Sequence, residues 1–114
     1  PSLLRTDGPT GEPSDVVRAR VMAARQRQSA RSDRTNARLD QGQTDAFCRL
    51  APRDSTLLER AVDSLQLSAR SLHRILRVAR TIADLAGSDA IETPHLTEAI
   101  GYRRLERGRE RAAA

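Results

Sequence analysis

The sequence contains few aromatic residues, a single cysteine, and neither lysine nor tryptophan. With one tyrosine and one phenylalanine, any hydrophobic core must be built from Leu, Ile, Val and Ala. Runs of β-branched and aromatic residues favour sheets, and their absence here indicates helix-on-helix packing. The lone Cys48 excludes an intramolecular disulfide, and its place after Phe47 in an apolar run indicates a small buried side chain.

Long apolar runs are also absent. No stretch approaches the roughly 18 consecutive apolar residues that predict a transmembrane helix, and no secretory signal peptide is recognisable. We therefore expect a cytoplasmic chain with no membrane partner. The first residue is Pro1 rather than methionine, which indicates a piece of a longer protein.

Arginine, by contrast, is abundant. The 20 residues counted as Lys and Arg are all arginine, against 15 acidic residues, which gives a formal net charge of +5. The exclusive use of arginine carries no functional information, because codon bias can produce it. The basic balance permits an anionic partner, such as nucleic acid or a nucleotide phosphate, without requiring one.

The 114 residues predict one domain, an all-α bundle of four to five helices. Residues 1–13, with three prolines and two glycines, are predicted to be a flexible linker from an upstream segment. The helical domain is assigned to residues 14–107, and residues 108–114 to a frayed tail. Periodicity and capping residues predict helices at 14–32, at 44–50, at 55–66 after Asp54, at 69–86 after Ser68, and after Thr93 with Pro94 in the first turn. The loop at 33–43 is expected to be anchored in the core by Leu39. In the last helix, Leu96, Ala99 and Ile100 are expected to face inward.

The helix predicted at 69–86 is the most informative element. Arg70 lies in its first turn, where the helix dipole disfavours a cation by about 0.3–1 kcal/mol. Either solvent screens this cost, or an anion lies nearby. On a helical wheel the buried stripe consists of Leu72, Ile75, Leu76, Ala79, Ile82, Ala83 and Ala86, and Gly87 follows as an αL cap. The opposite side, expected to face solvent, holds Arg70, Arg74, Arg77, Thr81 and Asp84, flanked by His73 and Arg80.

A second group of arginines lies in and after the first predicted helix. Their local positive field fits contact with DNA phosphates, a subunit interface, or a plain solvated face. No aromatic residue is present there to stack on bases, and no helix-turn-helix signature is evident. The group comprises Arg18, Arg20, Arg25, Arg27, Arg31, Arg34 and Arg38.

Two smaller expectations concern single residues. His73 and His95 lie on different predicted helices without cysteines or carboxylates at ligand spacing, so no metal site is expected. Tyr102 and Arg103 are expected to pack the last helix onto the bundle.

Several segments, in order, carry a family resemblance. They are V-V-R-A-R-V-M-A-A-R-Q-R-Q at 16–28, N-A-R-L at 36–39, F-C-R-L at 47–50, Q-L-S-A-R at 66–70, R-V-A-R-T-I-A-D-L at 77–85 and T-P-H-L-T-E-A-I-G-Y-R at 93–103. Together they resemble the C-terminal helical lid domain of the magnesium-chelatase-like AAA+ ATPases, in particular the competence protein ComM group. The resemblance covers about residues 14–104.

This resemblance implies a function that the residues alone do not. In the family the lid follows a nucleotide-binding core, and the arginine of the S-x-R turn resembles the sensor-2 arginine that reaches the γ-phosphate of ATP, in its own subunit or a neighbour. Here that residue is Arg70, with Ser68 as the helix cap. The ComM group implies a hexameric motor that moves along DNA and promotes branch migration during recombination of incoming DNA. The implied partners are the upstream core of the same chain, neighbouring subunits and DNA.

The chain lacks the other parts of such an ATPase. It has no G-x-x-x-x-G-K-[ST] loop for phosphates and no strand with acidic residues for Mg²⁺. ATP and Mg²⁺ are therefore expected as cofactors of the parent protein, and this chain alone is expected to bind neither and to hydrolyse no ATP. The alternative is a stand-alone basic helical module that binds nucleic acid or a partner protein through the arginine-rich first helix.

Overall fold

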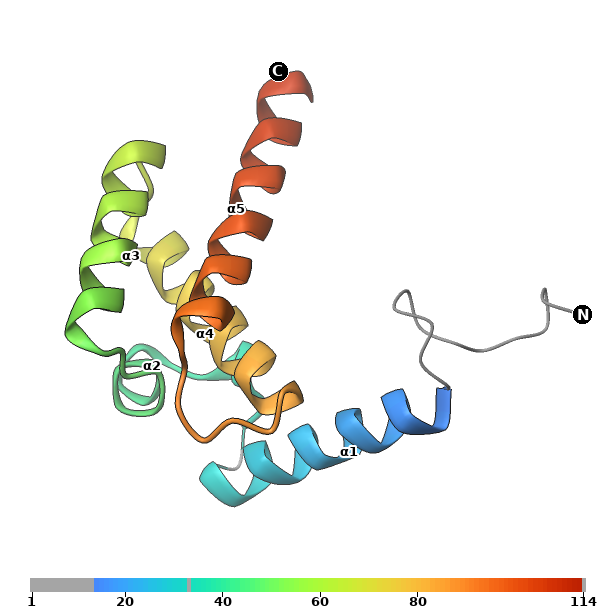
Figure 1. Ribbon diagram of the computed structural model, residues 1–114. Coiled ribbons are helices and arrows are strands. Elements are labelled where there is room, and N and C mark those ends of the chain that lie inside the picture. Colours follow the sequence, from blue (N-terminus) through green and yellow to red (C-terminus); the bar gives the residue numbers. More distant parts are fainter. Residues whose placement is uncertain (1–13, 33, 114) are drawn as a thin grey trace, which may run out of the picture.

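The computed structural model describes residues 14–32 and 34–113 (Figure 1). Within these residues it contains helices and no strand, which confirms the predicted all-α fold. The elements are α1 (Ser14–Arg31), the short 3₁₀ helix η2 (Asn36–Arg38), α2 (Gln41–Phe47), α3 (Pro52–Leu65), α4 (Ala69–Leu85) and α5 (Thr93–Ala113). The predicted linker, residues 1–13, lies outside the described residues.

Helix α4 is the centre of the bundle and contacts α1, α2, η2 and α5. The alanines Ala79 and Ala83 are fully buried on α4, and Ala99 is buried on α5, so these small side chains let the two helices pack closely. Figure 1 shows α1 leaving the bundle on one side and the C-terminal half of α5 extending beyond it. The core consists of Leu39, Cys48, Leu58, Ala61, Ile75, Leu76, Ala79, Ala83, Ile91, Leu96, Ala99 and Ile100.

The main core predictions are confirmed. Leu39 is 3% exposed and anchors the segment between α1 and α2. Leu96, Ala99 and Ile100 are buried on α5 as expected. Gly87 has a φ of 74°, the left-handed conformation expected of the residue that ends α4, and the amide of Ser88 donates to the carbonyl of Ala83 across this turn.

Three helix starts differ from the sequence prediction, and in one of them α5 begins at Thr93 itself rather than after it. Helix α2 begins at Gln41, inside the predicted loop, because Asp40 and Gln43 form a reciprocal capping box. Helix α3 begins at Pro52, so Asp54 lies in its first turn rather than at the cap. The buried Asp54 carboxylate instead accepts a 2.6 Å hydrogen bond from the Thr93 hydroxyl, and Thr93 is itself the first residue of α5.

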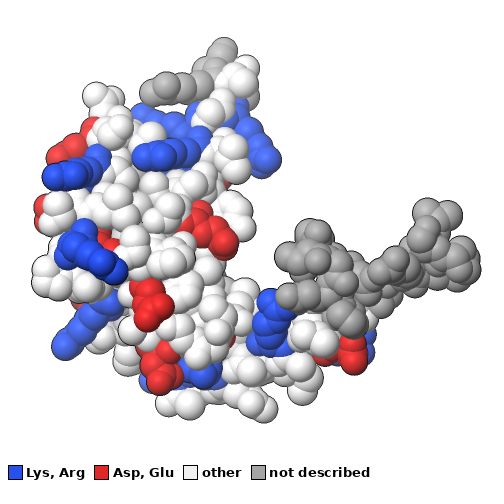
Figure 2. All heavy atoms as spheres, in the orientation of Figure 1, with Lys and Arg blue, Asp and Glu red and all other residues white. Residues whose placement is uncertain are grey.

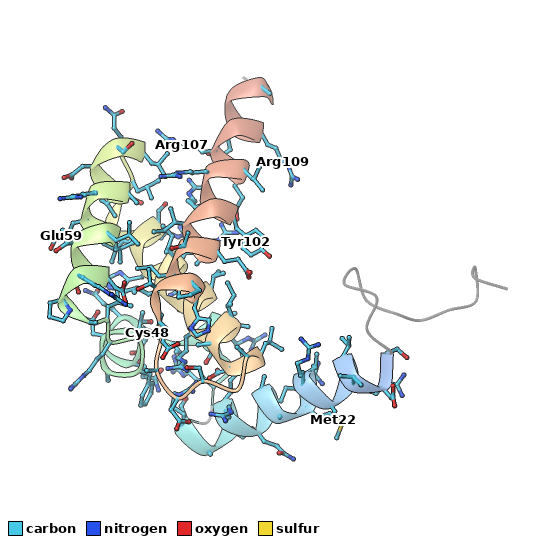
Figure 3. All side chains as sticks on the ribbon, in the orientation of Figure 1. Met22, Cys48, Glu59, Tyr102, Arg107 and Arg109 are labelled. Atoms are coloured by element: carbon cyan, nitrogen blue, oxygen red, sulfur yellow. The ribbon has the colours of Figure 1, made fainter. Side chains whose placement is uncertain are left out.

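The last helix, α5, also differs from the prediction at Tyr102 and at its C-terminal end. Tyr102 is 50% exposed and does not pack into the bundle, contrary to the expectation (Figure 3). Helix α5 continues through Ala113, beyond residue 107 where the domain was expected to end.

Cys48 is expected to be an unreactive thiol. It is buried at the end of α2, and burial raises its pKa to about 11. At pH 8 the thiolate fraction is then roughly two-hundredfold lower than for an ordinary cysteine with a pKa near 8.5. Alkylation by iodoacetamide should be at least that much slower in the native chain than in urea. Equal rates in the two conditions would show that the thiol is accessible.

Candidate functional site at the first turn of helix α4

A tight turn between α3 and α4 sets the direction in which α4 starts. Gln66 adopts the left-handed conformation, with φ 52° and ψ 51°, which is uncommon for a residue other than glycine. The amide of Leu67 donates to the carbonyl of Val62, and the Leu67 side chain packs against the core. This is a Schellman-type helix end, in which an apolar contact holds the turn in one conformation.

Ser68 caps α4 as predicted. Its Oγ accepts a hydrogen bond of 3.2 Å from the amide of Ser71. Arg70 follows in the first turn and is exposed, and this turn contains no acidic residue. Among the described residues, the Arg70 guanidinium has no hydrogen-bond or ion-pair partner. The helix therefore begins with a free guanidinium beside the amides that carry its partial positive charge.

One exposed ion pair joins the next turn of α4 to α5, and further pairs lie within α5 beside it. Arg74 forms an exposed ion pair with Glu106 of α5 at 3.4 Å. Arg103, whose side chain is only 12% exposed, donates to Glu106 at 3.2 Å and to Glu110 at 3.1 Å. Arg103 thus belongs to the helix surface that packs, as predicted, whereas Tyr102 does not.

The strongest polar contacts lie at the other end of α4, around the Asp84 carboxylate. Arg31 of α1 binds both of its oxygens, at 2.7 and 3.0 Å. Asn36 of η2 donates to it at 2.8 Å, and Arg80 lies 3.1 Å away on the preceding turn of α4. Asp84 is 1% exposed and Arg80 3% exposed. These four residues, the Asp84 cluster, tie α1 and η2 to α4.

Burial and hydrogen bonding act on Asp84 in opposite directions. Burial alone would raise its pKa, but the hydrogen bonds from Arg31 and Asn36, with the charge of Arg80, hold the pKa below its ordinary value. The bond to Asp84 raises the pKa of Arg31. Burial lowers the pKa of Arg80. The carboxylate is therefore ionised at neutral pH, and the buried arginines depend on it.

The Asp84 cluster corrects the helical-wheel prediction. The wheel placed Asp84 on the side expected to face solvent and Arg80 at the edge of that side, but both side chains are buried. Arg80 also donates to the backbone carbonyls of Ser88 and Asp89, which fixes the loop before α5. The sequence contained a signal for this: Leu76, Arg80 and Asp84 are each four residues apart, so they share one side of the helix with the core. Ala86, by contrast, was placed in the buried stripe and is exposed.

The seven arginines in and after α1 do not form one surface. Arg31 belongs to the Asp84 cluster, and Arg27 pairs with Asp89 at 2.7 Å and donates to the carbonyl of Gly87. Arg34 lies 3.9 Å from Asp40. Part of the predicted basic surface is therefore a set of structural contacts. Arg18, Arg20, Arg25 and Arg38 are exposed on α1 and η2.

The described residues contain neither a metal-ligating cluster nor a membrane-spanning helix. No group of three or more His, Cys, Asp or Glu side chains lies close enough together to hold a metal ion. His73 lies 3.3 Å from Asp45, and the ring of His95 accepts a hydrogen bond from the amide of Glu92. None of the helices combines the length and the apolar character that a membrane crossing requires.

The sequence of this chain also matches a known protein family. The family model for the C-terminal region of magnesium chelatase subunit ChlI matches residues 11–103. The chain belongs to this family, which confirms the resemblance seen in its motifs.

Individual relatives narrow the group. The chain is 44% identical to competence protein ComM of Haemophilus influenzae over 104 residues. This alignment covers 91% of this chain and 20% of ComM. It is 45% identical to YifB of Escherichia coli over 107 residues. This alignment covers 94% of this chain and 21% of YifB. The chain thus spans about a fifth of the length of the curated relatives that it matches.

Proposed function

We propose that this chain is the helical lid of a magnesium-chelatase-like AAA+ ATPase that remodels DNA, and that Arg70 contacts the γ-phosphate of ATP bound by the ATPase core. The family match and the similarity to a competence protein support the class. The observation that carries the assignment of the site is the exposed guanidinium of Arg70 in the first turn of α4, which has no partner among the described residues.

The local chemistry suits a phosphate ligand. A guanidinium stays charged at neutral pH and donates to phosphate oxygens as a planar fork. Because Ser68 and the Gln66 turn fix the start of α4, Arg70 projects from a well-defined helix end. A γ-phosphate beside this end would be attracted by the guanidinium and by the helix dipole together.

In the parent protein, ATP with Mg²⁺ would supply the phosphoryl group and the charge that develops on it. Arg70 would stabilise that charge and would link the state of the nucleotide to the position of the lid. The proposed partners are the core that precedes this domain in the same chain, neighbouring subunits of a hexamer, and the DNA on which such a motor promotes branch migration in recombination.

The test is the rate of ATP hydrolysis by the full-length protein with Arg70 replaced by alanine. A sharp loss of turnover, with the lid still folded, supports the proposal. Unchanged turnover contradicts it.

A further inference from the structure

We propose that the groove between α3 and α5 binds the phosphodiester backbone of a nucleic acid, and that Arg60 and Arg104 make the contacts. This surface lies on the lid itself and is distinct from Arg70. It also differs from the arginine-rich α1 that the sequence indicated.

The groove has a volume of about 240 Å³. Arg60 and Ser64 line it from α3, and Thr97 and Arg104 from α5, above a floor of Leu57, Ala61 and Ile100. No carboxylate is among these lining residues. Arg60 and Arg104 therefore border a common hollow from two different helices, which is an arrangement that suits a bridging anion.

Both arginines are free to take a ligand. Arg60 and Arg104 are exposed, and neither has a hydrogen-bond or ion-pair partner among the residues that the structure describes. The Ser64 hydroxyl is likewise unpartnered there, whereas the Thr97 hydroxyl already donates to the carbonyl of Thr93. Within the described residues, the groove thus offers unpaired guanidinium donors and no lining carboxylate that competes for them.

The positive charge continues beyond the groove. Arg107 lies three residues after Arg104, and Figure 3 shows it reaching from α5 toward the end of α3, while Glu59 points away on the far side of α3. The Nε of Arg107 is buried without a hydrogen-bond partner within the described part of the chain. In Figure 2, arginine side chains lie over the C-terminal parts of α3 and α5, with acidic side chains beside them over α3. A row of cations along a groove fits a linear polyanion better than a single small anion.

The floor of the groove argues against an acidic amphipathic helix as the ligand. Such a helix would need apolar surface on which to bury its large side chains. Ala61 and Ile100 are each only 4% exposed because they belong to the core, and Leu57 is partly buried. Little apolar surface is left, so the binding free energy would come from charge. No aromatic residue lines the groove, which favours contact with the backbone rather than with bases.

The experiment measures binding of the 114-residue chain to a short, fluorescently labelled DNA duplex by anisotropy, at several salt concentrations. The groove variant is Arg60→Ala with Arg104→Ala. The matched control is Arg18→Ala with Arg25→Ala, which removes the same charge from exposed positions of α1. All four side chains are exposed, so circular dichroism should show that both variants fold.

We expect the groove variant to bind about tenfold more weakly at roughly 50 mM salt, and its plot of log affinity against log salt to be shallower by about 1.8, since each neutralised phosphate contributes about 0.9. The control should change neither value appreciably. Absence of DNA binding at this salt, or equal losses in the two variants, would overturn the proposal. Displacement of the DNA by polyglutamate at equal charge would instead identify a docking surface for acidic protein. Neither variant alters Arg70, so the result is independent of the proposed ATPase role.

Discussion

Replacing Asp84 by alanine is expected to lower the free energy of unfolding by about 3–5 kcal/mol, because it leaves buried arginines without their counter-charge. Arg80 is 3% exposed and cannot regain water without disturbing the helix on which it lies. Arg31 would lose both of its bonds to the carboxylate, and with them the main attachment of α1 to α4. A loss of this size is a large part of the stability of a small domain. Urea unfolding followed by circular dichroism measures it.

The matched control is Asp89→Ala. Asp89 also pairs with an arginine of α1, Arg27, but its side chain is 99% exposed. Solvent screens such a pair, so its loss should leave the urea midpoint almost unchanged. If Asp84→Ala were as mild as Asp89→Ala, the Asp84 cluster would not be what holds α1 in place.

The contribution of Asp84 should also depend on pH. Its pKa is lower in the folded chain than in the unfolded chain, where it lies near 3.9. Between these two values the unfolded state binds more protons, so stability rises with pH. The stabilisation is complete above the unfolded pKa and is lost as pH falls through the folded pKa. The difference in unfolding free energy between the native chain and Asp84→Ala should therefore narrow below about pH 4, as urea titrations at several pH values would show. A constant difference down to pH 2 would mean that folding does not change the pKa of Asp84.

Replacing Arg70 by alanine in the full-length protein is expected to reduce ATP turnover by about a hundredfold or more, the range seen when one charged donor to a reacting phosphoryl or acyl group is removed. Lysine at this position should restore only part of the rate, because it keeps the charge but loses the planar fork. Stability should hardly change, since Arg70 is exposed and without a partner among the described residues. A steady-state ATPase assay, with the unfolding midpoint of each variant, measures both effects.

Arg74→Ala is the control for this experiment. Arg74 is one turn further along the same helix, is 59% exposed and makes only a weak exposed pair with Glu106. Its loss should leave turnover near the native rate. An equal loss in both variants would point to the general charge of α4 rather than to a phosphate contact by Arg70.

The sequence predicted most of the fold correctly because local signals and tertiary packing agree there. The apolar spacing of Ile75, Leu76, Ala79 and Ala83 marks the buried side of α4, and Ser68 and Gly87 mark its ends. The starts of α2 and α3 were misplaced because several residues could serve as caps. Asp40 makes the capping box of α2, and Asp54, the predicted cap of α3, instead accepts a hydrogen bond from the Thr93 hydroxyl.

The polar residues also include some that the sequence placed correctly and some that it did not. Arg70 was found by its motif, and its exposure follows from its place in the first turn of α4. Arg80 and Asp84 were misread because a helical wheel assigns charged residues to solvent, whereas partners from α1 and η2 allow them to be buried. The groove of Arg60 and Arg104 joins residues more than forty positions apart, which no local pattern connects.

By itself, then, the sequence determined the helices, the aliphatic core, the family and the position of Arg70, because each depends on spacing along a single segment. Only the tertiary structure decided which charges are buried, which arginines of α1 serve as structural contacts, and which cations remain free around one groove. The physical reason is that the state of a charged side chain depends on the partners and solvent around it, and those partners come from distant segments.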